Sequence, residues 1–252
     1  MLDGACWARA LTSNEARRSV VLGAAGIRLR WDGGYGQAAT PTPSFGRSQV
    51  AADSLECSAP EPMIMVLKPA EADEQLTAAG VACPACGGTL APWGYARSRS
   101  VRDHHGEVEL RPRRARCRGC RTTHVLLPAY CLPRRAVTVE IVGAALLAKV
   151  NGASHRTIAA DLGLDADTVR GWIRQASAHA SWLFRRGTIM VHEFDPDPTP
   201  IRPAGTALGD ALAALGAAAA AAVRRLGGRA GTWELIAQFT GGRLLTPIAR
   251  SG

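Results

Sequence analysis

Residues 83–120 read CPACGGTLAPWGYARSRSVRDHHGEVELRPRRARCRGC, with a Cys-x-x-Cys pair at each end. Cys83 and Cys86 form the first pair, Cys117 and Cys120 the second, and thirty residues stand between the pairs. Two such pairs can place four thiolates around one tetrahedral Zn²⁺. Disulfides and unrelated buried thiols are the alternatives, and the sequence shows no secretory signal that would favour disulfides. We therefore expect a four-cysteine Zn²⁺ site.

The segment between the pairs has the pattern of short strands. Residues 89–95 can form one strand, residues 101–110 turn near Asp103 in the manner of a hairpin, and residues 124–127 can form a third strand that Pro128 ends. The prediction is a β-rich zinc ribbon over residues 80–132.

Three histidines and a further cysteine lie near the pairs. Because four cysteines already satisfy one zinc ion, His104, His105 and His124 are interpreted as turn or surface residues. Cys131 is interpreted as a small buried residue.

Positive charge gathers in the same region. The 252-residue chain has a net charge of +9 and a pI near 9.8. Residues 97–135 hold eleven arginines and three acidic residues, which gives +8. A basic block beside a metal site is typical of a surface that binds a polyanion, although a solvated face of a hairpin is the alternative. The residues expected to contact DNA phosphates are Arg111, Arg113, Arg114 and Arg116.

Residues 137–180 have a helical pattern. Residues 138–150 predict one helix, and residues 155–174 fit the helix-turn-helix pattern, with a second helix over residues 165–177. Gly163 stands at the turn, where positive φ is often needed. Ser154 and Asp165 suit N-cap positions. Val169 and Trp172 are expected to fill the angle between the two helices, so Trp172 is interpreted as core rather than as a base-stacking group.

The outward face of the second helix suits a DNA groove. Its residues are short near the start, at Ala166 and Gly171, and Arg170 and Arg174 stand four residues apart, where they can reach guanine or phosphate. Asp167 could accept from cytosine or favour the helix N-terminus electrostatically. The full set expected to contact double-stranded DNA here is His155, Arg156, Asp167, Thr168, Arg170 and Arg174, with His155 and Arg156 on phosphates. His179 is interpreted as a bystander.

The flanking segments carry weaker signals. Residues 1–62 are rich in Gly, Pro, Ser and Thr and predict a disordered tail or a misplaced start, with Met63 or Met65 as the functional start. Residues 181–205 predict a Pro-rich linker. Residues 206–240 predict C-terminal helices, an Ala-rich one over 206–226 and a short one over 232–239. The apolar stripe of the Ala-rich helix predicts either packing on the helical domain or a homodimer seam.

Several function classes are disfavoured. The sequence has neither a strongly apolar span of eighteen residues nor the pattern of a signal peptide, so we expect a cytoplasmic protein without a membrane partner. His192, Glu193, Asp195 and Asp197 form the one cluster of acidic residues with a histidine, but it falls in the expected linker, so we expect no catalytic site. We also expect no small-molecule substrate.

The sequence also resembles a known group of proteins. The features that carry the resemblance are CPACGG at residues 83–88, WGY at residues 93–95, the arginine-rich strand, the second cysteine pair and the helix-turn-helix. Together they resemble the N-terminal DNA-binding regions of insertion-sequence transposases. The similarity covers roughly residues 80–178 and is closer to stand-alone proteins of the same layout. By position, the resemblance implies that the metal ligands are Cys83, Cys86, Cys117 and Cys120. It also implies that residues 155–174 are the segment that recognises DNA. We therefore expect that the resemblance does not extend to transposase activity.

The combined expectation is an α+β protein in which a zinc ribbon precedes a three-helix unit. The expected function is zinc-stabilised, sequence-specific DNA binding by a non-enzymatic regulator or transposase-derived protein. The alternatives are a DNA-binding subunit of a recombinase whose catalytic domain is a separate chain, and a zinc-ribbon adaptor that binds protein.

Overall fold

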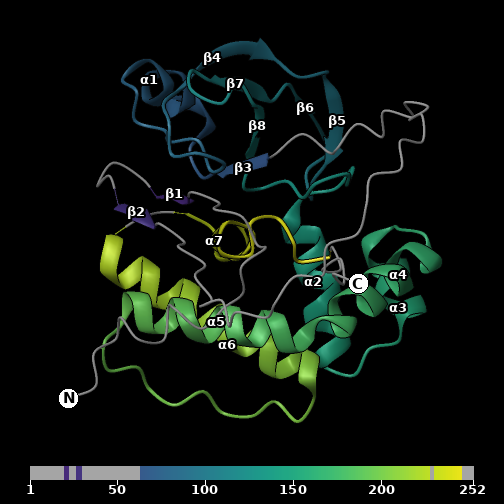
Figure 1. Ribbon diagram of the computed structural model, residues 1–252. Coiled ribbons are helices and arrows are strands. Elements are labelled where there is room, and N and C mark those ends of the chain that lie inside the picture. The colour runs from purple at the N-terminus through teal and green to yellow at the C-terminus, as the bar shows by residue number, and fades with distance from the viewer. Residues whose placement is uncertain (1–19, 23–26, 30–62, 228–229, 246–252) are drawn as a thin grey trace, which may run out of the picture.

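The computed structural model describes residues 20–22, 27–29, 63–227 and 230–245 (Figure 1). Over these residues the chain is α+β, as predicted: a small mixed sheet is followed by a body of helices. Most of residues 1–62 lies outside the described residues, and with it most of the predicted N-terminal tail.

The main sheet has the strand order β2-β1-β3-β8-β7-β4. Strand β7 pairs antiparallel with both β4 and β8, whereas β3 pairs parallel with β8. The strands are β1 (Val20–Leu22), β2 (Ile27–Leu29), β3 (Met63–Val66), β4 (Leu90–Tyr95), β7 (Arg113–Cys117) and β8 (Thr123–Pro128). The strands predicted over 89–95 and 124–127 are thus present.

Three strands were not expected. β3 precedes the predicted ribbon, and its Ile64 and Val66 are buried. β1 and β2 fall inside residues 1–62, where no partner segment was expected; β1 pairs with β2 and contacts β3 at Val21 and Val66. Stretches of three or four residues are too short to show the alternation that predicts a strand.

One face of the sheet forms a small core. Helix α1 (Ala72–Thr77), which follows the 3₁₀ turn η2 (Pro69–Glu71), contributes buried Ala72 and Leu76 to it. The buried residues include Ile64, Val66, Leu76, Val81, Leu90, Ala115 and Leu126, together with Cys83 and Cys117. Two of the four predicted metal ligands, Cys83 and Cys117, therefore belong to the core of the sheet.

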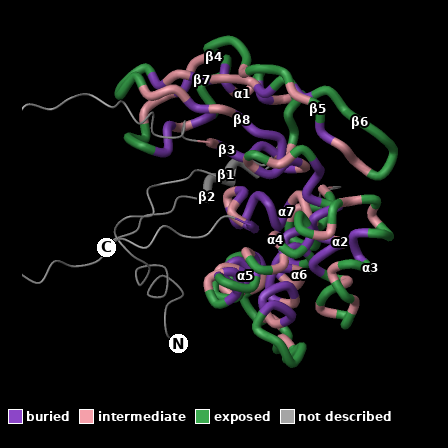
Figure 2. Tube along the Cα trace, turned by 90° about the vertical axis from the view of Figure 1, so that its right-hand side faces the viewer, coloured by how far each residue is buried: buried purple, intermediate pink, exposed green. Residues whose placement is uncertain are grey.

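The hairpin between the cysteine pairs belongs to a different core. Strands β5 (Arg99–Arg102) and β6 (Glu107–Leu110) form a separate two-stranded sheet whose tip is exposed (Figure 2). Val101 and Leu110 are buried in the same cluster as the helices. The backbone of Arg102 also bonds to the chain that leads into α2, with Arg102 N to Ala136 O at 2.8 Å and Thr138 N to Arg102 O at 2.9 Å.

The three helices predicted after the sheet are α2 (Val139–Val150), α3 (His155–Leu162) and α4 (Ala166–Ala178). The predicted caps are present: Ser154 Oγ accepts from Thr157 N at 3.2 Å, and Asp165 Oδ1 accepts from Asp167 N and Thr168 N at 2.9 and 3.0 Å. Gly163 ends α3 with φ +60°. Val169 and Trp172 are buried between the helices, as expected.

The linker predicted over residues 181–205 is wrong for most of its length. Residues 180–194 form helix α5 (Ala180–Phe194), and the irregular segment is limited to residues 195–206. Its buried positions Leu183, Gly187, Met190, Val191 and Phe194 recur at helical spacing. The prolines that indicate a linker begin only at Pro196, after α5 has ended at Phe194.

Helix α6 (Ala207–Leu226) packs along α5, and α7 (Thr232–Phe239) ends the helical body (Figure 1). Helices α5 and α6 run in the same direction, because Gly187 abuts Ala214 and Leu215 while Asp195 Oδ2 pairs with Arg224 Nη2 at 3.0 Å. A Cβ at Gly187 would stand 2.7 Å from the backbone of α6, so the small residue permits the close approach.

The apolar stripe of α6 is used inside the chain. Its Leu212, Leu215, Ala219 and Ala222 are buried in the main core, as the packing alternative predicted. Among the described helices, α6 is the one whose length and composition would suit a membrane span, yet 56% of that window is buried within the fold. Packing against α5 thus accounts for its apolar character.

Candidate metal centre and basic surfaces

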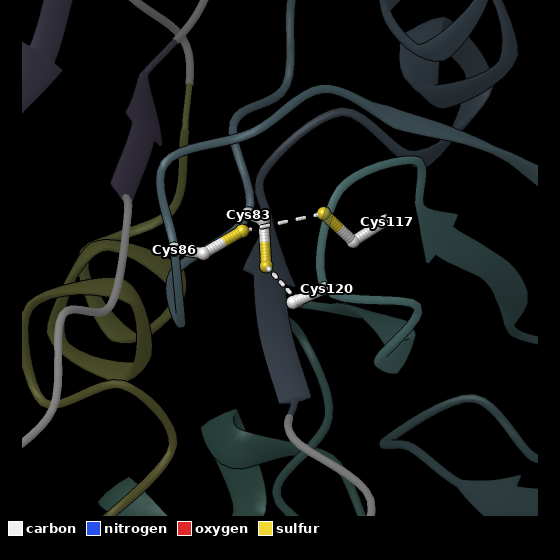
Figure 3. A group of neighbouring side chains, drawn as sticks. All are labelled: Cys83, Cys86, Cys117 and Cys120. Atoms are coloured by element: carbon white, nitrogen blue, oxygen red, sulfur yellow. Dashed lines mark hydrogen bonds between the residues drawn. The ribbon is translucent and has the colours of Figure 1, made fainter.

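The four predicted cysteine ligands meet at one point. Their Sγ atoms all lie within 4.8 Å of one another (Figure 3). Cys83 Sγ stands 3.6 Å from Cys120 Sγ, and Cys86 Sγ stands 3.5 Å from Cys117 Sγ. Thiolates bound tetrahedrally to Zn²⁺ at about 2.3 Å stand about 3.8 Å apart. The cluster therefore fits a metal ion that, like zinc, prefers four thiolate ligands in a tetrahedral arrangement.

The sulfur atoms are too far apart for disulfides, in which the bonded atoms are about 2.05 Å apart, and all four cysteines are free. The structure therefore forms no disulfide in this cluster, and the four cysteines are free to act as ligands. Cys6 and Cys57 lie outside the described residues.

Local turns aim the thiolates. In the first pair, Gly87 N donates to Cys83 O at 2.8 Å and Cys83 N donates to Gly88 O at 2.7 Å. In the second, Cys117 N donates to Thr122 O at 2.9 Å. The residue after each pair, Gly87 or Arg121, has positive φ, at 74° and 64°. Each pair thus reverses the chain tightly and leaves its sulfur atoms facing the other pair.

The thiols differ in how readily they ionise. Burial raises the pKa of Cys83 to about 12, because the interior disfavours the thiolate. The hydroxyl of Thr122, 3.3 Å from Cys120 Sγ, lowers the pKa of the exposed Cys120 to about 6. A buried thiolate such as that of Cys83 needs a metal ion or a hydrogen-bond donor beside it.

The nearby histidines divide into two kinds. His104 and His105 are exposed at the hairpin turn, as expected, and Asp103 Oδ1 accepts from His105 N at 2.6 Å. The expectation for His124 was wrong: it is fully buried, and its Nε2 lies 3.3 Å from Cys83 Sγ. No spacing rule marks it, because β8 brings it to the cluster through the sheet. Cys131 is buried, as expected.

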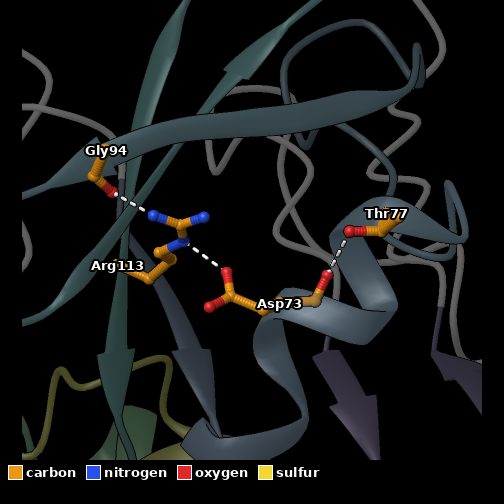
Figure 4. A network of polar contacts seen from close by, with 4 residues as sticks. All are labelled: Asp73, Thr77, Gly94 and Arg113. Atoms are coloured by element: carbon orange, nitrogen blue, oxygen red, sulfur yellow. Dashed lines mark hydrogen bonds and ion pairs between the residues drawn. The ribbon is translucent and has the colours of Figure 1, made fainter.

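The ribbon arginines have structural contacts of their own. Arg113 Nε pairs with Asp73 Oδ1, and Arg113 Nη1 donates to Gly94 O at 3.2 Å (Figure 4). Arg111 and Arg113 both lie over the ring of Tyr95, at 4.9 and 4.4 Å.

Arg116 lies 4.6 Å over the ring of Trp93 and donates to Arg121 O. Arg113, Arg114 and Arg116 are half-buried, and Arg111 is exposed. Of the four predicted phosphate contacts, Arg111 is thus the most accessible.

The outer face of α4 is open. Asp167, Thr168, Arg170 and Arg174 are exposed, and a Cβ at Gly171 would meet nothing within 4 Å. Arg170 Nη2 pairs with Asp167 Oδ1 at 3.0 Å, so Asp167 orients this arginine besides standing in the first turn. On α3, Arg156 is exposed and His155 is half-buried.

Two contacts were missed in the sequence. Arg102 reaches from the hairpin to the end of α3, where Nη1 donates to Gly163 O at 2.8 Å and Nη2 donates to Leu162 O at 2.7 Å. His179 is buried, with Nε2 3.1 Å from both Arg243 O and Leu244 O, so it holds the chain after α7 rather than being a bystander. These hydrogen bonds join residues that are 60 to 65 positions apart, so a local sequence pattern does not reveal them.

The acidic cluster is not gathered into a site. His192 and Glu193 lie on α5, and Asp195 pairs with Arg224. Within the described part of the chain, the four cysteines are the one group of three or more His, Cys, Asp or Glu side chains placed to hold a metal ion.

The comparisons with known proteins cover part of the chain. Residues 83–172 match a family described as a domain of unknown function (DUF6431). The match runs from Cys83 to Trp172, so it covers the four clustered cysteines, the hairpin, helices α2 and α3, and about half of α4. No curated protein and no solved structure matches.

Proposed function

We propose that the protein is a Zn²⁺-stabilised DNA-binding protein without catalytic activity, in which the ribbon contacts phosphates and α4 enters the major groove. The observation that carries the metal part is the convergence of four Sγ atoms within 4.8 Å. Zinc would hold together a sheet whose own apolar core is small. We further propose that the protein acts in the cytoplasm.

The open face of α4 supports the DNA part. Two arginines four residues apart, a glycine facing open space and a firmly capped N-terminus are what a helix needs to approach base edges closely. The Arg170 side chain is exposed, and its ion pair with Asp167 orients it on the outer face of α4. The net charge of +9 favours a polyanionic partner.

The contacts of the β5–β6 hairpin support the proposal that the ribbon and the helices bind DNA together. Arg102 caps the end of α3, and Val101 and Leu110 share the core of the helices. Ribbon and helices thereby have a fixed relative position. Contacts made by Arg111 on a phosphate would then set the register in which α4 meets the bases.

The experiment is a selection from a random DNA pool with purified protein whose metal content is measured in the same preparation. We expect one Zn²⁺ per chain and enrichment of a single sequence family. Folded protein without metal would refute the metal part. Enrichment of no sequence, together with no shift of any duplex at low salt, would refute the DNA part and favour the protein adaptor.

A further inference from the structure

His124 occupies an unusual place for a histidine. It lies on β8 opposite Ala115 of β7, and both residues are fully buried. Its neighbours on that face of the sheet include Leu90 and Leu126. A small apolar core gains nothing from an imidazole unless the ring has a polar partner. One such partner is Cys83 Sγ, 3.3 Å from Nε2.

The chemistry of that contact depends on the thiolate. Four thiolates and one Zn²⁺ carry a net charge of about −2, which is costly where water is excluded. Cys83 and Cys117 are buried, at 2% and 1% exposed, whereas Cys86 and Cys120 are exposed to solvent, which can donate to their sulfur atoms. Hydrogen-bond donors for the two buried sulfur atoms must therefore come from the protein, and His124 Nε2 stands beside Cys83 in addition to the backbone amides of Ala85 and Cys86.

We propose that His124 is a positioning residue of the metal centre, whose Nε2–H donates to the Cys83 thiolate and holds it on the metal. This inference rests on the proposed binding of Zn²⁺. Groups that hydrogen-bond to metal ligands commonly change metal affinity 10- to 100-fold when they are removed. The side chain would act through Cys83 and would not itself be a ligand.

The test compares three variants by competition for Zn²⁺ with a chromophoric chelator. His124→Phe fills the cavity without a donor and is expected to weaken Zn²⁺ binding about 10- to 100-fold. His124→Gln keeps an N–H near the Nε2 position and is expected to restore most of the affinity. His105→Phe, at the exposed hairpin turn, is the control and should bind as the native protein does. Native affinity in His124→Phe, or equal losses in the Phe and Gln variants, would overturn the inference.

A second measurement needs no variant. In native protein loaded with ¹¹³Cd²⁺, the ¹⁵N shifts of the His124 ring should show the proton on Nε2. A coupling between that proton and the metal through the sulfur atom would show the hydrogen bond directly. A proton on Nδ1 with a bare Nε2 would overturn the inference even if every variant failed to fold. A native protein that binds neither metal would overturn both this inference and the proposed metal binding, whereas unaffected variants overturn this inference alone.

Discussion

Arg113 and Arg111 lie over the same tyrosine, yet their surroundings give them different tasks. Arg113 is 19% exposed and pairs with Asp73 of α1, so it joins the helix to the sheet. Arg111 is exposed, and stacking on Tyr95 leaves its guanidinium open to solvent. A basic sequence run thus contains residues that serve the fold and residues that are free to contact a ligand.

This difference predicts separable effects. Arg113→Ala should lower the free energy of unfolding by about 1 kcal/mol, since an exposed partner such as Asp73 limits what the pair contributes. Arg111→Ala should lower stability less than Arg113→Ala does, because it loses only its contact with Tyr95. It should weaken binding to every duplex alike and reduce the slope of log K against log salt by about one unit. Denaturant unfolding and salt-dependent titration measure the two effects. An unchanged salt slope in Arg111→Ala would remove it from the phosphate contacts.

Gly143 of α2 provides a test of the packing between α2 and α7. A Cβ there would stand 2.0 Å from the ring of Trp233, which cannot move without disturbing α7. Gly143→Ala should destabilise the fold by about 1–3 kcal/mol, although alanine is the better helix former. Gly216→Ala is the matched control, because a Cβ at Gly216 meets nothing, and it should stabilise α6 by up to about 1 kcal/mol. Equal effects of the two changes in thermal unfolding would contradict this packing.

At the scale of elements, the hairpin β5–β6 lies between the two cysteine pairs in sequence but packs with the helices. Cys117→Ser should therefore release the metal and expose the amide groups of β4 and β7 to exchange. The hairpin and helices α2–α4 should stay protected, because their core does not include the cysteine ligands. Hydrogen exchange of the metal-loaded native protein and the variant measures this. Loss of protection throughout the chain would show a single cooperative unit instead.

The two candidate starts at Met63 and Met65 differ in how much of strand β3 they keep. A chain that begins at Met63 keeps β3 and its pairing with residues 125–128 of β8, whereas one that begins at Met65 loses buried Ile64 and half of that pairing. We expect the shorter chain to melt several degrees lower. Equal melting temperatures would show that β3 contributes little. A large loss on deleting 1–62 would show that β1 and β2 matter more than their short contact with β3 suggests.

The sequence was most informative where chemistry or capping is local. Cysteine spacing predicted the cluster, and Ser154, Asp165 and Gly163 marked the ends of helices that the structure confirms. It failed where a partner is distant. His124 and Arg102 contact residues that are 41 and about 60 positions away in the sequence. Helix α5 was missed because the prolines that follow it favoured a linker over the helical spacing of its apolar residues. Register and packing, rather than composition, place such residues.

At the scale of the whole molecule, the metal cluster and α4 lie in different cores and are joined through the hairpin. The side chain of Arg102 binds the end of α3. Its backbone carbonyl accepts from Thr138 N, and Thr138 is the residue before α2. The matched family spans these parts together. We therefore expect metal loss to weaken DNA binding by misplacing the ribbon arginines, while α4 itself stays folded.

The most direct test is a binding titration of native protein and Arg170→Ala on the selected duplex and a scrambled one. Arg185→Ala is the matched control, because it removes an exposed arginine from α5 instead of α4. The account predicts that Arg170→Ala costs about 1–3 kcal/mol on the selected duplex and much less on the scrambled one, with Arg185→Ala affecting neither strongly. Equal weakening on both duplexes, or no difference between the two variants, would contradict base reading by α4.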